Sequence, residues 1–498
     1  MLGRTDPAMT MHTPIPTDLP HPGKPKSFYE RRKPVFPRKI DGAFRRFKWA
    51  VMGLCLAVYW ITPWIRWDRG PYAPHQAVLI DLAHRRFYLF QIEIWPQEFY
   101  FVAGLLIMAG IGLFLVTSAV GRAWCGFACP QTVWTDLFQH VDRLIDGDRN
   151  AQAKLDAAPW TAAKVGRRGF KWSVYLAIAF ITGGAWIFYF ADAPTLQREF
   201  WAGTAAPVAY ASTAVLTFTT LWLGGFMREQ VCIYMCPWPR IQSAMLDEKS
   251  LLVTYKFWRG EPRGSVKAAE KAPGTVGDCI DCGLCTADCP TGIDIREGPQ
   301  IGCITCALYI DACDRVMLDI GRPRGLIDYT TLENAALEQQ GAAPVPILKT
   351  LSHPRTLIYF AVWAAVGAGL LFALGTRTRV GLSIAHDRNP AFVMESDGHI
   401  RNGMTARLEN MEDRPRAMTL QIEGLPGAKF YTDAMNSGSA VRALPVNLPA
   451  DATLPLRLYV TAPRGTPAGD FAFTLTSPAE KAQPRRTTTR FITPETAP

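Results

Sequence analysis

The chain has 498 residues, enough for about three domains. Apolar residues make up 49% of it and charged residues only 19%, against about 25% in typical soluble proteins, which disfavours a soluble globular protein. The net charge of +10 does not indicate a nucleic-acid partner, because the basic residues gather beside apolar segments, as they do in membrane proteins.

The first part of the chain predicts an arm followed by membrane helices. Residues 1–45 are rich in proline and basic side chains and lack apolar periodicity, which predicts a disordered arm. Five later stretches reach the roughly 17–25 apolar residues that cross a bilayer. They lie at 49–65, 99–118, 172–191, 208–226 and 357–375. We therefore predict a four-helix transmembrane region at 46–248, a fifth transmembrane helix at 356–376, and lipid as a partner.

The distribution of Lys and Arg predicts the orientation of these helices. Ten basic residues lie at 24–48, before the first stretch, and five lie at 154–171, before the third. The connection at 192–207 carries Arg198 alone. Positive-inside asymmetry then predicts a cytoplasmic N-terminus and, after five crossings, a C-terminus on the opposite side. Four arginines in the connection at 66–97 run against this orientation.

Two further segments predict β-structure. Residues 77–81 and 86–90 are short apolar runs around a polar turn, which predicts a hairpin at the membrane surface. Between 377 and 498, apolar and polar residues alternate at 405–409, 418–422, 456–460 and 471–475, with Pro- and Gly-rich turns between them. This alternation predicts an antiparallel β-sandwich that buries one face of each sheet.

The strongest chemical signal is a cysteine run at 279–290. Cys279, Cys282, Cys285 and Cys289-Pro290 follow the C-x2-C-x2-C-x3-C-P spacing of bacterial ferredoxins. In that pattern three thiolates surround one iron–sulfur cluster and the fourth binds a second cluster. Zinc is the competing interpretation, but zinc sites usually join two separate C-x2-C pairs.

A second run at 303–313 has the same spacing with one exchange. It contains Cys303, Cys306 and Cys313, with Tyr309 at the place of the third cysteine. Crossed ligation assigns Cys279, Cys282, Cys285 and Cys313 to a complete 4Fe–4S cluster. It leaves Cys289, Cys303 and Cys306 for a second cluster, which is a three-iron cluster, a four-iron cluster with an unusual fourth ligand such as Asp311, or a degraded site. We predict a cytoplasmic ferredoxin-like domain at 249–355.

Two C-x3-C-P pairs follow apolar stretches. Cys125 and Cys129 follow the second stretch, and Cys232 and Cys236 follow the fourth. On a helix, positions i and i+4 share a face, so each pair is expected to present two sulfurs to one ion. Soft thiolates favour Cu(I), zinc or an iron–sulfur cluster, and both pairs are predicted on the same side of the membrane.

Longer strings resemble one known family, the cytochrome c oxidase accessory proteins of the polyferredoxin type, called FixG, RdxA or CcoG. The resemblance covers nearly the whole chain. Its most specific strings lie at 66–71, 92–99, 124–134, 236–240, 289–296 and 321–326.

The resemblance implies a bacterial inner-membrane protein with five transmembrane helices, a cytoplasmic two-cluster ferredoxin domain and a periplasmic immunoglobulin-like C-terminal domain. It also implies a role in assembly of cbb3-type oxidase, in which Cu(II) is reduced to Cu(I). Partners would be oxidase subunits, copper chaperones or transporters, and an electron donor of unknown identity. The family's copper-handling positions are here Cys125, Cys129, Cys232 and Cys236. Tyr309 departs from the family's eight-cysteine pattern.

Two other functions are compatible with the same residues. One is a quinol-linked electron conduit to another membrane redox partner. The other is a non-enzymatic scaffold for oxidase assembly, in which clusters and sandwich serve to dock subunits.

Overall fold

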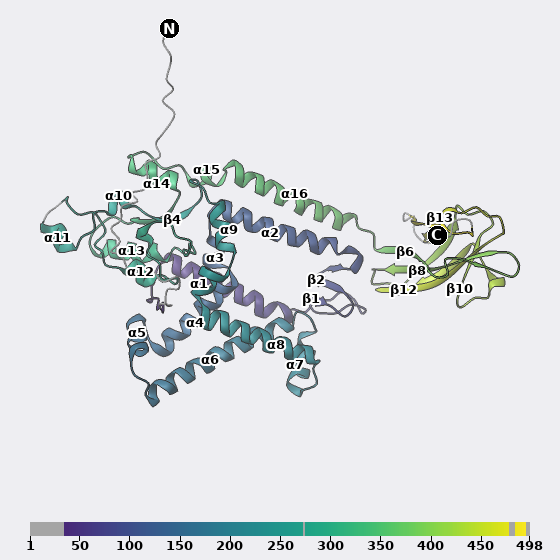
Figure 1. Ribbon diagram of the computed structural model, residues 1–498, viewed down its shortest axis with the longest axis horizontal. Coiled ribbons are helices and arrows are strands. Elements are labelled where there is room, and N and C mark those ends of the chain that lie inside the picture. Colours follow the sequence, from purple (N-terminus) through teal and green to yellow (C-terminus); the bar gives the residue numbers. More distant parts are fainter. Residues whose placement is uncertain (1–33, 272–273, 478–483, 495–498) are drawn as a thin grey trace, which may run out of the picture.

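The computed structural model describes residues 34–271, 274–477 and 484–494. Long helices form the middle of the molecule (Figure 1), with the cysteine-rich domain at one end and a β-sandwich at the other. Within the described residues, the two ends are joined through the helices and a small sheet, β1–β3, which lies on the sandwich side.

Each predicted membrane stretch lies largely in a helix. The long helices are α1 (Ala43–Ile61), α2 (Tyr100–Val120), α6 (Ala162–Ile187), α8 (Pro207–Thr220) continuing as the π-helix η3 (Leu221–Met227), and α16 (Pro354–Thr376). Within the described residues, three helical segments are long and apolar enough to cross a membrane: Pro96–Val120, Ala162–Ile187 and Pro354–Thr376. The bent pair Ala193–Ala202 and Pro207–Met227 makes a fourth if it counts as one span. Helix α1 is not among them, and its 19 residues include Arg45, Arg46 and Lys48.

The start of α1 corrects the predicted disorder of residues 1–45. Residues 1–33 lie outside the described residues, but the prediction is wrong for 34–45, which are docked on the cysteine-rich domain. The guanidinium of Arg38 lies 2.9 Å from the carboxylate of Asp288, whose side chain is fully buried. The carboxylate of Asp311 accepts the backbone N–H groups of Phe44 at 3.2 Å and Arg45 at 2.7 Å, so it caps the N-terminus of α1.

Helix α6 also begins earlier than predicted, at Ala162 and not at 172. The hydroxyl of Thr161 accepts the N–H of Lys164 at 3.2 Å and caps the helix. The ammonium of Lys171, one residue before the predicted start, pairs with Asp142 at 3.3 Å and with Asp146. Paired basic residues thus extend the helix beyond its apolar part.

Short helices connect the long ones on the cysteine side. They are α3 (Ala123–Phe127), α4 (Pro130–Asp146), α5 (Arg149–Ala157), the π-helix η4 (Val231–Met235) and α9 (Trp238–Met245). The helix α7 (Ala193–Ala202) precedes α8. The cysteine-rich domain follows with β4 (Leu252–Tyr255), α10 (Phe257–Gly260), α11 (Val266–Lys271), α12 (Leu284–Asp288), α13 (Leu308–Asp319), β5 (Ile327–Thr330), α14 (Leu332–Gln339) and α15 (Ile347–Leu351). Strands β4 and β5 pair antiparallel and close this domain.

The C-terminal region is a sandwich of two antiparallel sheets. One contains β10 (Lys429–Thr432), β12 (Ala452–Ala462), β8 (Ile400–Asn410) and β6 (Val380–His386) in that order, with β7 (Val393–Met394) paired to β8. The other contains β11 (Ala443–Leu448), β9 (Arg416–Glu423), β13 (Gly469–Thr476) and β14 (Arg485–Phe491). Phe430, Phe473 and Phe491 are fully buried between the sheets, as the period-two pattern requires.

A three-stranded sheet joins the sandwich to the helices. It contains β1 (Val78–Asp81), β2 (Arg86–Leu89) and β3 (Ile92–Ile94), so the predicted hairpin forms and gains a third strand. The guanidinium of Arg86 lies 2.8 Å from both carboxylate oxygens of Asp451 in the sandwich and 3.2 Å from Glu93. Arg66 pairs with Asp192 at 2.5 Å. These two arginines of the 66–97 connection are therefore paired with carboxylates within the fold. They count less strongly against the predicted membrane orientation than unpaired basic residues would.

We call the contact between the β1–β3 sheet and the sandwich the joint. Its stability is expected to depend on pH. Burial, reinforced by the charge of Asp451, raises the pKa of Glu93 to about 7 from its ordinary value of 4.5. The joint is therefore most stable below about pH 4.5 and loses this contribution as the pH rises through 7, because docking then buries an ionised carboxylate beside Asp451. The full effect is about 3 kcal/mol, because each pKa unit corresponds to about 1.4 kcal/mol.

We expect hydrogen exchange in β3, corrected for its intrinsic pH dependence, to be slower at pH 5.5 than at pH 8. Glu93→Gln should remove the difference, whereas Glu423→Gln, on an exposed strand end of the sandwich, should preserve it. An unchanged pH dependence in Glu93→Gln would contradict the assignment.

Candidate functional site

The structure brings four thiols of the two cysteine runs together at the surface end of the domain. Burial raises the pKa of the Cys313 thiol, from α13, to about 12, and electrostatic interactions with the thiols of Cys285, Cys279 and Cys282 add to this shift. Cys282 is exposed, and Cys279 and Cys285 are buried. This is the set that crossed ligation assigns to the first cluster.

A repeated loop conformation positions both runs. Asp281 and Gly283 have φ values of 53° and 65°, and Thr305 and Ala307, at the same places in the second run, have 55° and 60°. Each loop leads into a helix, α12 or α13, and these two helices pack together. Tyr309 consequently occupies the place in the second loop that Cys285 occupies in the first.

The second site is more deeply buried. Cys289, Cys303 and Cys306 have 1%, 9% and 2% of their surface exposed. Burial and the neighbouring thiols of Cys306 and Cys289 raise the pKa of Cys303 to about 12. The Cys289 sulfur forms hydrogen bonds with the hydroxyls of Tyr309 at 2.9 Å and Thr291 at 3.2 Å. Asp311, considered as a fourth ligand on sequence grounds, instead caps α1.

The residue after a cysteine decides the local geometry of the C-x3-C-P pairs. Cys129, Cys236 and Cys289 each precede a proline and have extended ψ values of 130°, 124° and 123°. Proline disfavours the helical conformation of the residue before it. The expectation that each pair lies on one helical face is therefore wrong, because Cys129 and Cys236 lie where helices end.

The four membrane-proximal thiols nevertheless form one group. The thiol of Cys232 interacts with those of Cys129, Cys125 and Cys236, and burial with these interactions raises its pKa to about 12. Burial likewise raises the pKa of Cys125 to about 11, opposed by the charge of Arg122. The Cys125 thiol donates to Oε1 of Gln242 at 3.1 Å, and the fully buried Gln242 amide donates to Thr117 at 3.0 Å. A soft metal binding here would displace thiol protons.

The spacing of the thiols distinguishes a site for a single metal ion from a site for an iron–sulfur cluster. In the part of the chain that the structure describes, no three His, Cys, Asp or Glu side chains are grouped closely enough to hold a single metal ion. An iron–sulfur cluster spreads its ligands more widely, because each thiolate binds a different iron atom. The two ferredoxin sites, with their converging thiols, therefore fit clusters. The residues that would hold them are Cys279, Cys282, Cys285 and Cys313 at the first site and Cys289, Cys303 and Cys306 at the second.

A glycine brings the membrane-proximal thiols against the second site. A Cβ atom placed on Gly126, between Cys125 and Cys129, would lie 2.8 Å from the carbonyl oxygen of Ile304 and 3.0 Å from Cα of Cys306. Cys125 and Cys306 accordingly belong to one buried cluster with Ile304. Only a residue without a side chain permits this approach.

Sequence reasoning missed the buried charges beside this contact. Arg45 and Asp136 pair at 2.8 Å with side chains that are each 3% exposed, and Lys48 is 2% exposed. Although burial opposes it, the charges of Lys48 and Arg45 lower the pKa of Asp136. Lys48 also interacts with the Cys306 thiol. Arg45 and Lys48 lie just before an apolar stretch, where basic residues indicate membrane orientation, so their sequence position gives no sign of this local role.

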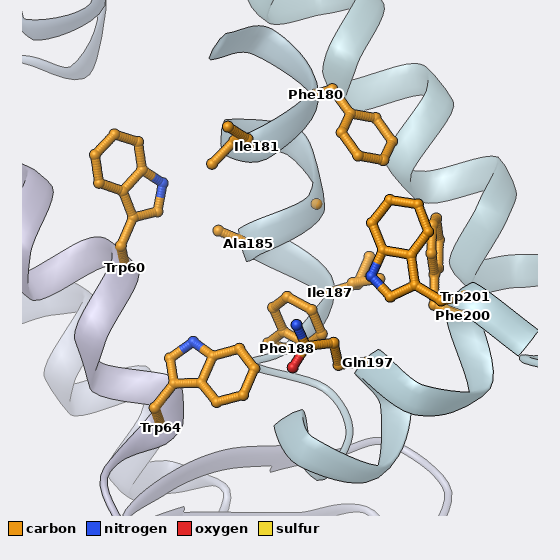
Figure 2. A pocket seen from close by; sticks show the side chains of 11 residues that line it. Trp60, Trp64, Phe180, Ile181, Ala185, Ile187, Phe188, Gln197, Phe200 and Trp201 are labelled. Carbon is orange, nitrogen blue, oxygen red and sulfur yellow. The ribbon is translucent and has the colours of Figure 1, made fainter. Parts of the chain in front are cut away.

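An apolar cavity of about 260 Å³ lies at the other end of α1. Figure 2 shows Trp60 and Trp64 on one side and Phe180, Phe200 and Trp201 on the other. At 1.5 Å per residue, Trp60 lies roughly 20 Å along α1 from Lys48. The cavity is thus remote from the cysteine sites.

Three family models match the chain. They are a 4Fe–4S dicluster domain at 227–332, a 4Fe–4S binding domain at 101–147, and the IG-like fold at the C-terminus of FixG at 370–494. With the apolar helices and the converging thiols, these matches define a membrane-associated iron–sulfur electron-transfer protein.

Named relatives are similar over most of their length. The nitrogen fixation protein FixG of Rhizobium meliloti is 56% identical over 461 residues, which cover 88% of each chain. Protein RdxA of Cereibacter sphaeroides is 55% identical over 446 residues, covering 90% of this chain and 93% of that protein. A crystal structure of a FixG-related protein from Vibrio parahaemolyticus, 18% identical, aligns with a TM-score of 0.20 over 24% of this chain and 99% of that one. The chain belongs to the FixG/RdxA family.

The buried ion pair is expected to be essential to the cysteine end of the molecule. Asp136→Ala leaves the Arg45 guanidinium buried without its partner, which costs about 3–5 kcal/mol. We expect a large loss of folded, cluster-containing protein, measured by size exclusion and by iron per chain. Asp156→Ala removes the partner of Arg168 at 3.0 Å, and because the Asp156 side chain is 48% exposed its effect should be within about 1 kcal/mol. Equal yields for the two variants would contradict this.

Proposed function

We propose that this protein is a cupric reductase, which passes electrons to Cu(II) held by Cys125, Cys129, Cys232 and Cys236 and releases Cu(I) for assembly of the copper centre of cbb3-type oxidase. The observation that carries the proposal is the contact of Gly126 with the Ile304–Cys306 backbone, because it joins a thiol group to an iron–sulfur site.

The order of the three sites supports an electron path from the surface inwards. Cys282 is exposed, so the first site is accessible to an external donor. The ligands of the second site are buried and lie against the membrane-proximal thiols. When bound, iron–sulfur clusters at these sites supply one-electron transfer.

The chemistry of the thiol group suits copper in its reduced state. Cu(II) favours nitrogen and oxygen ligands, whereas Cu(I) favours soft sulfur at low coordination. Two of the four thiolates therefore suffice to stabilise Cu(I). Copper binding at this site does not need three side chains grouped around one ion. One electron enters for each Cu(II) reduced, and the thiol protons leave to solvent when copper binds.

The proposal includes a membrane topology. It places five transmembrane helices in a bacterial inner membrane, with α1 as the first, the cysteine-rich domain in the cytoplasm and the sandwich in the periplasm. Oxidase subunits or copper carriers would be the partners. The positive charge beside the starts of α1 and α6 supports this orientation.

The test is an anaerobic single-turnover experiment on the full-length protein in detergent. The clusters are reduced, one equivalent of Cu(II) is added, and cluster absorbance is followed with a Cu(I) chelator present. We expect reoxidation of the clusters matched by Cu(I), and loss of both when Cys125, Cys129, Cys232 and Cys236 are changed to Ser. Cys55→Ser, in the middle of α1, is the matched control. Clusters that stay reduced in the presence of Cu(II) would reject copper as the acceptor.

A second candidate has its own supporting observation. The 4Fe–4S binding model at 101–147 includes Cys125 and Cys129, so the four thiols are also suited to a further cluster in an electron conduit to a quinone or a redox partner. Iron analysis separates the two functions: a four-serine variant that loses about four irons per chain favours the conduit, and one that loses none favours copper. Oxidase assembly that survives loss of Cys279 and Cys285 would favour a scaffold over both.

The contact at Gly126 makes a further prediction. Gly126→Ala forces the Cys125 loop away from Ile304, because its Cβ meets backbone atoms that have no room to move. We expect the copper-dependent reoxidation rate to fall by about tenfold or more while iron content is retained. Gly166→Ala, in α6 with nothing within 4 Å of the added Cβ, should react at the wild-type rate. An unchanged rate in Gly126→Ala would remove the contact from the electron path.

A further inference from the structure

The second iron–sulfur site has three cysteines and one tyrosine in equivalent positions. The second loop repeats the backbone of the first, including both left-handed residues, and the place of Cys285 is taken by Tyr309. A side chain at that place in the first loop joins the group of four thiols. The fold therefore directs the Tyr309 side chain toward the second group of thiols.

The surroundings of the phenol agree with this placement. Tyr309 is 2% exposed, and its oxygen lies 2.9 Å from the Cys289 sulfur. The phenol also lies close enough to the thiols of Cys303 and Cys306 to interact with them electrostatically, so it belongs with the three cysteines of the site. The nearest acidic alternative, Asp311, is engaged with the N-terminus of α1.

We propose that Tyr309 is the fourth ligand of the second site and that its phenolate oxygen binds one iron of a four-iron cluster. The Fe–O bond forms as the phenol O–H bond breaks, and the proton leaves to solvent, as the protons of the cysteine ligands do when their thiolates bind iron. No electron is transferred in this step. The inference concerns ligation alone and does not depend on copper as the acceptor.

Nearby cations compensate the added negative charge. Lys48 interacts with the Cys306 thiol, and Arg122 interacts with the Cys303 thiol. Both cationic side chains belong to residues that are less than 4% exposed. A phenolate is a harder donor than a thiolate, so the ligand distinguishes this cluster electronically from the all-cysteine cluster at the first site.

The test uses full-length protein enriched in 57Fe and purified without oxygen. Tyr309→Phe removes the oxygen and should convert the second cluster to a three-iron form, with about one iron fewer per chain and the EPR signal of an oxidised three-iron cluster. Tyr309→Cys restores a four-ligand site and should retain the full iron content. Tyr255→Phe is the matched control, because its phenol interacts with Cys279 at the first site without occupying a ligand place.

Isotope labelling gives a direct readout of the Fe–O bond. Ring-deuterated tyrosine should produce a hyperfine coupling to the reduced second cluster in wild-type protein and in Tyr255→Phe, and no such coupling in Tyr309→Cys. If Tyr309→Phe does not fold, the hyperfine coupling in wild type compared with that in Tyr309→Cys is sufficient to test the ligation by Tyr309. Equal iron content and Mössbauer spectra in wild type and Tyr309→Phe, or a wild-type cluster without the coupling, would overturn the assignment.

Discussion

The arrangement of the redox sites depends on how the start of α1 is held between two other elements. Asp311 of α13 accepts the backbone N–H groups of Phe44 and Arg45 at the start of α1, and Asp136 of α4 pairs with the side chain of that same Arg45. Both contacts are buried, where an unpaired charge or N–H group is costly. They lock the ferredoxin-like domain onto the membrane-proximal helices, so the distance between the two thiol groups is set by rigid elements and not by a flexible linker.

Rigid docking matters because the membrane-proximal thiols and the second iron–sulfur site are brought together by close backbone contacts. Gly121 ends α2 with a φ of 62° and would clash with the carbonyl of Leu251 if it had a side chain. Gly126 also approaches the loop of Cys303 and Cys306 too closely to carry a side chain. Two glycines without side chains thus let the Cys125–Cys129 loop pass between a membrane helix and the iron–sulfur domain. A family of electron-transfer proteins needs such fixed spacing between its redox centres.

Several features were predictable from particular residues. The apolar stretches form helices, the alternating runs form the strands of the sandwich, and the cysteine spacing predicted which thiols of the two ferredoxin runs come together. The pairs at Cys129 and Cys236 were misjudged, because helical periodicity was applied across a residue that precedes proline. The docked segment at 34–45 was misjudged as well, since its many charges indicate disorder until Arg38 and Arg45 are seen to pair with buried carboxylates.

The sequence by itself determined the class of chemistry, because cysteine type and spacing are local properties that a C-x2-C-x2-C loop expresses wherever it folds. Only the tertiary structure decided that Cys125 and Cys129 come near Cys232 and Cys236, about a hundred positions away. It also decided that the phenol of Tyr309 contacts the thiol of Cys289 while Asp311 is turned to α1. These are contacts between distant segments, and they are set by the packing of helices and loops against one another. No local pattern encodes that packing.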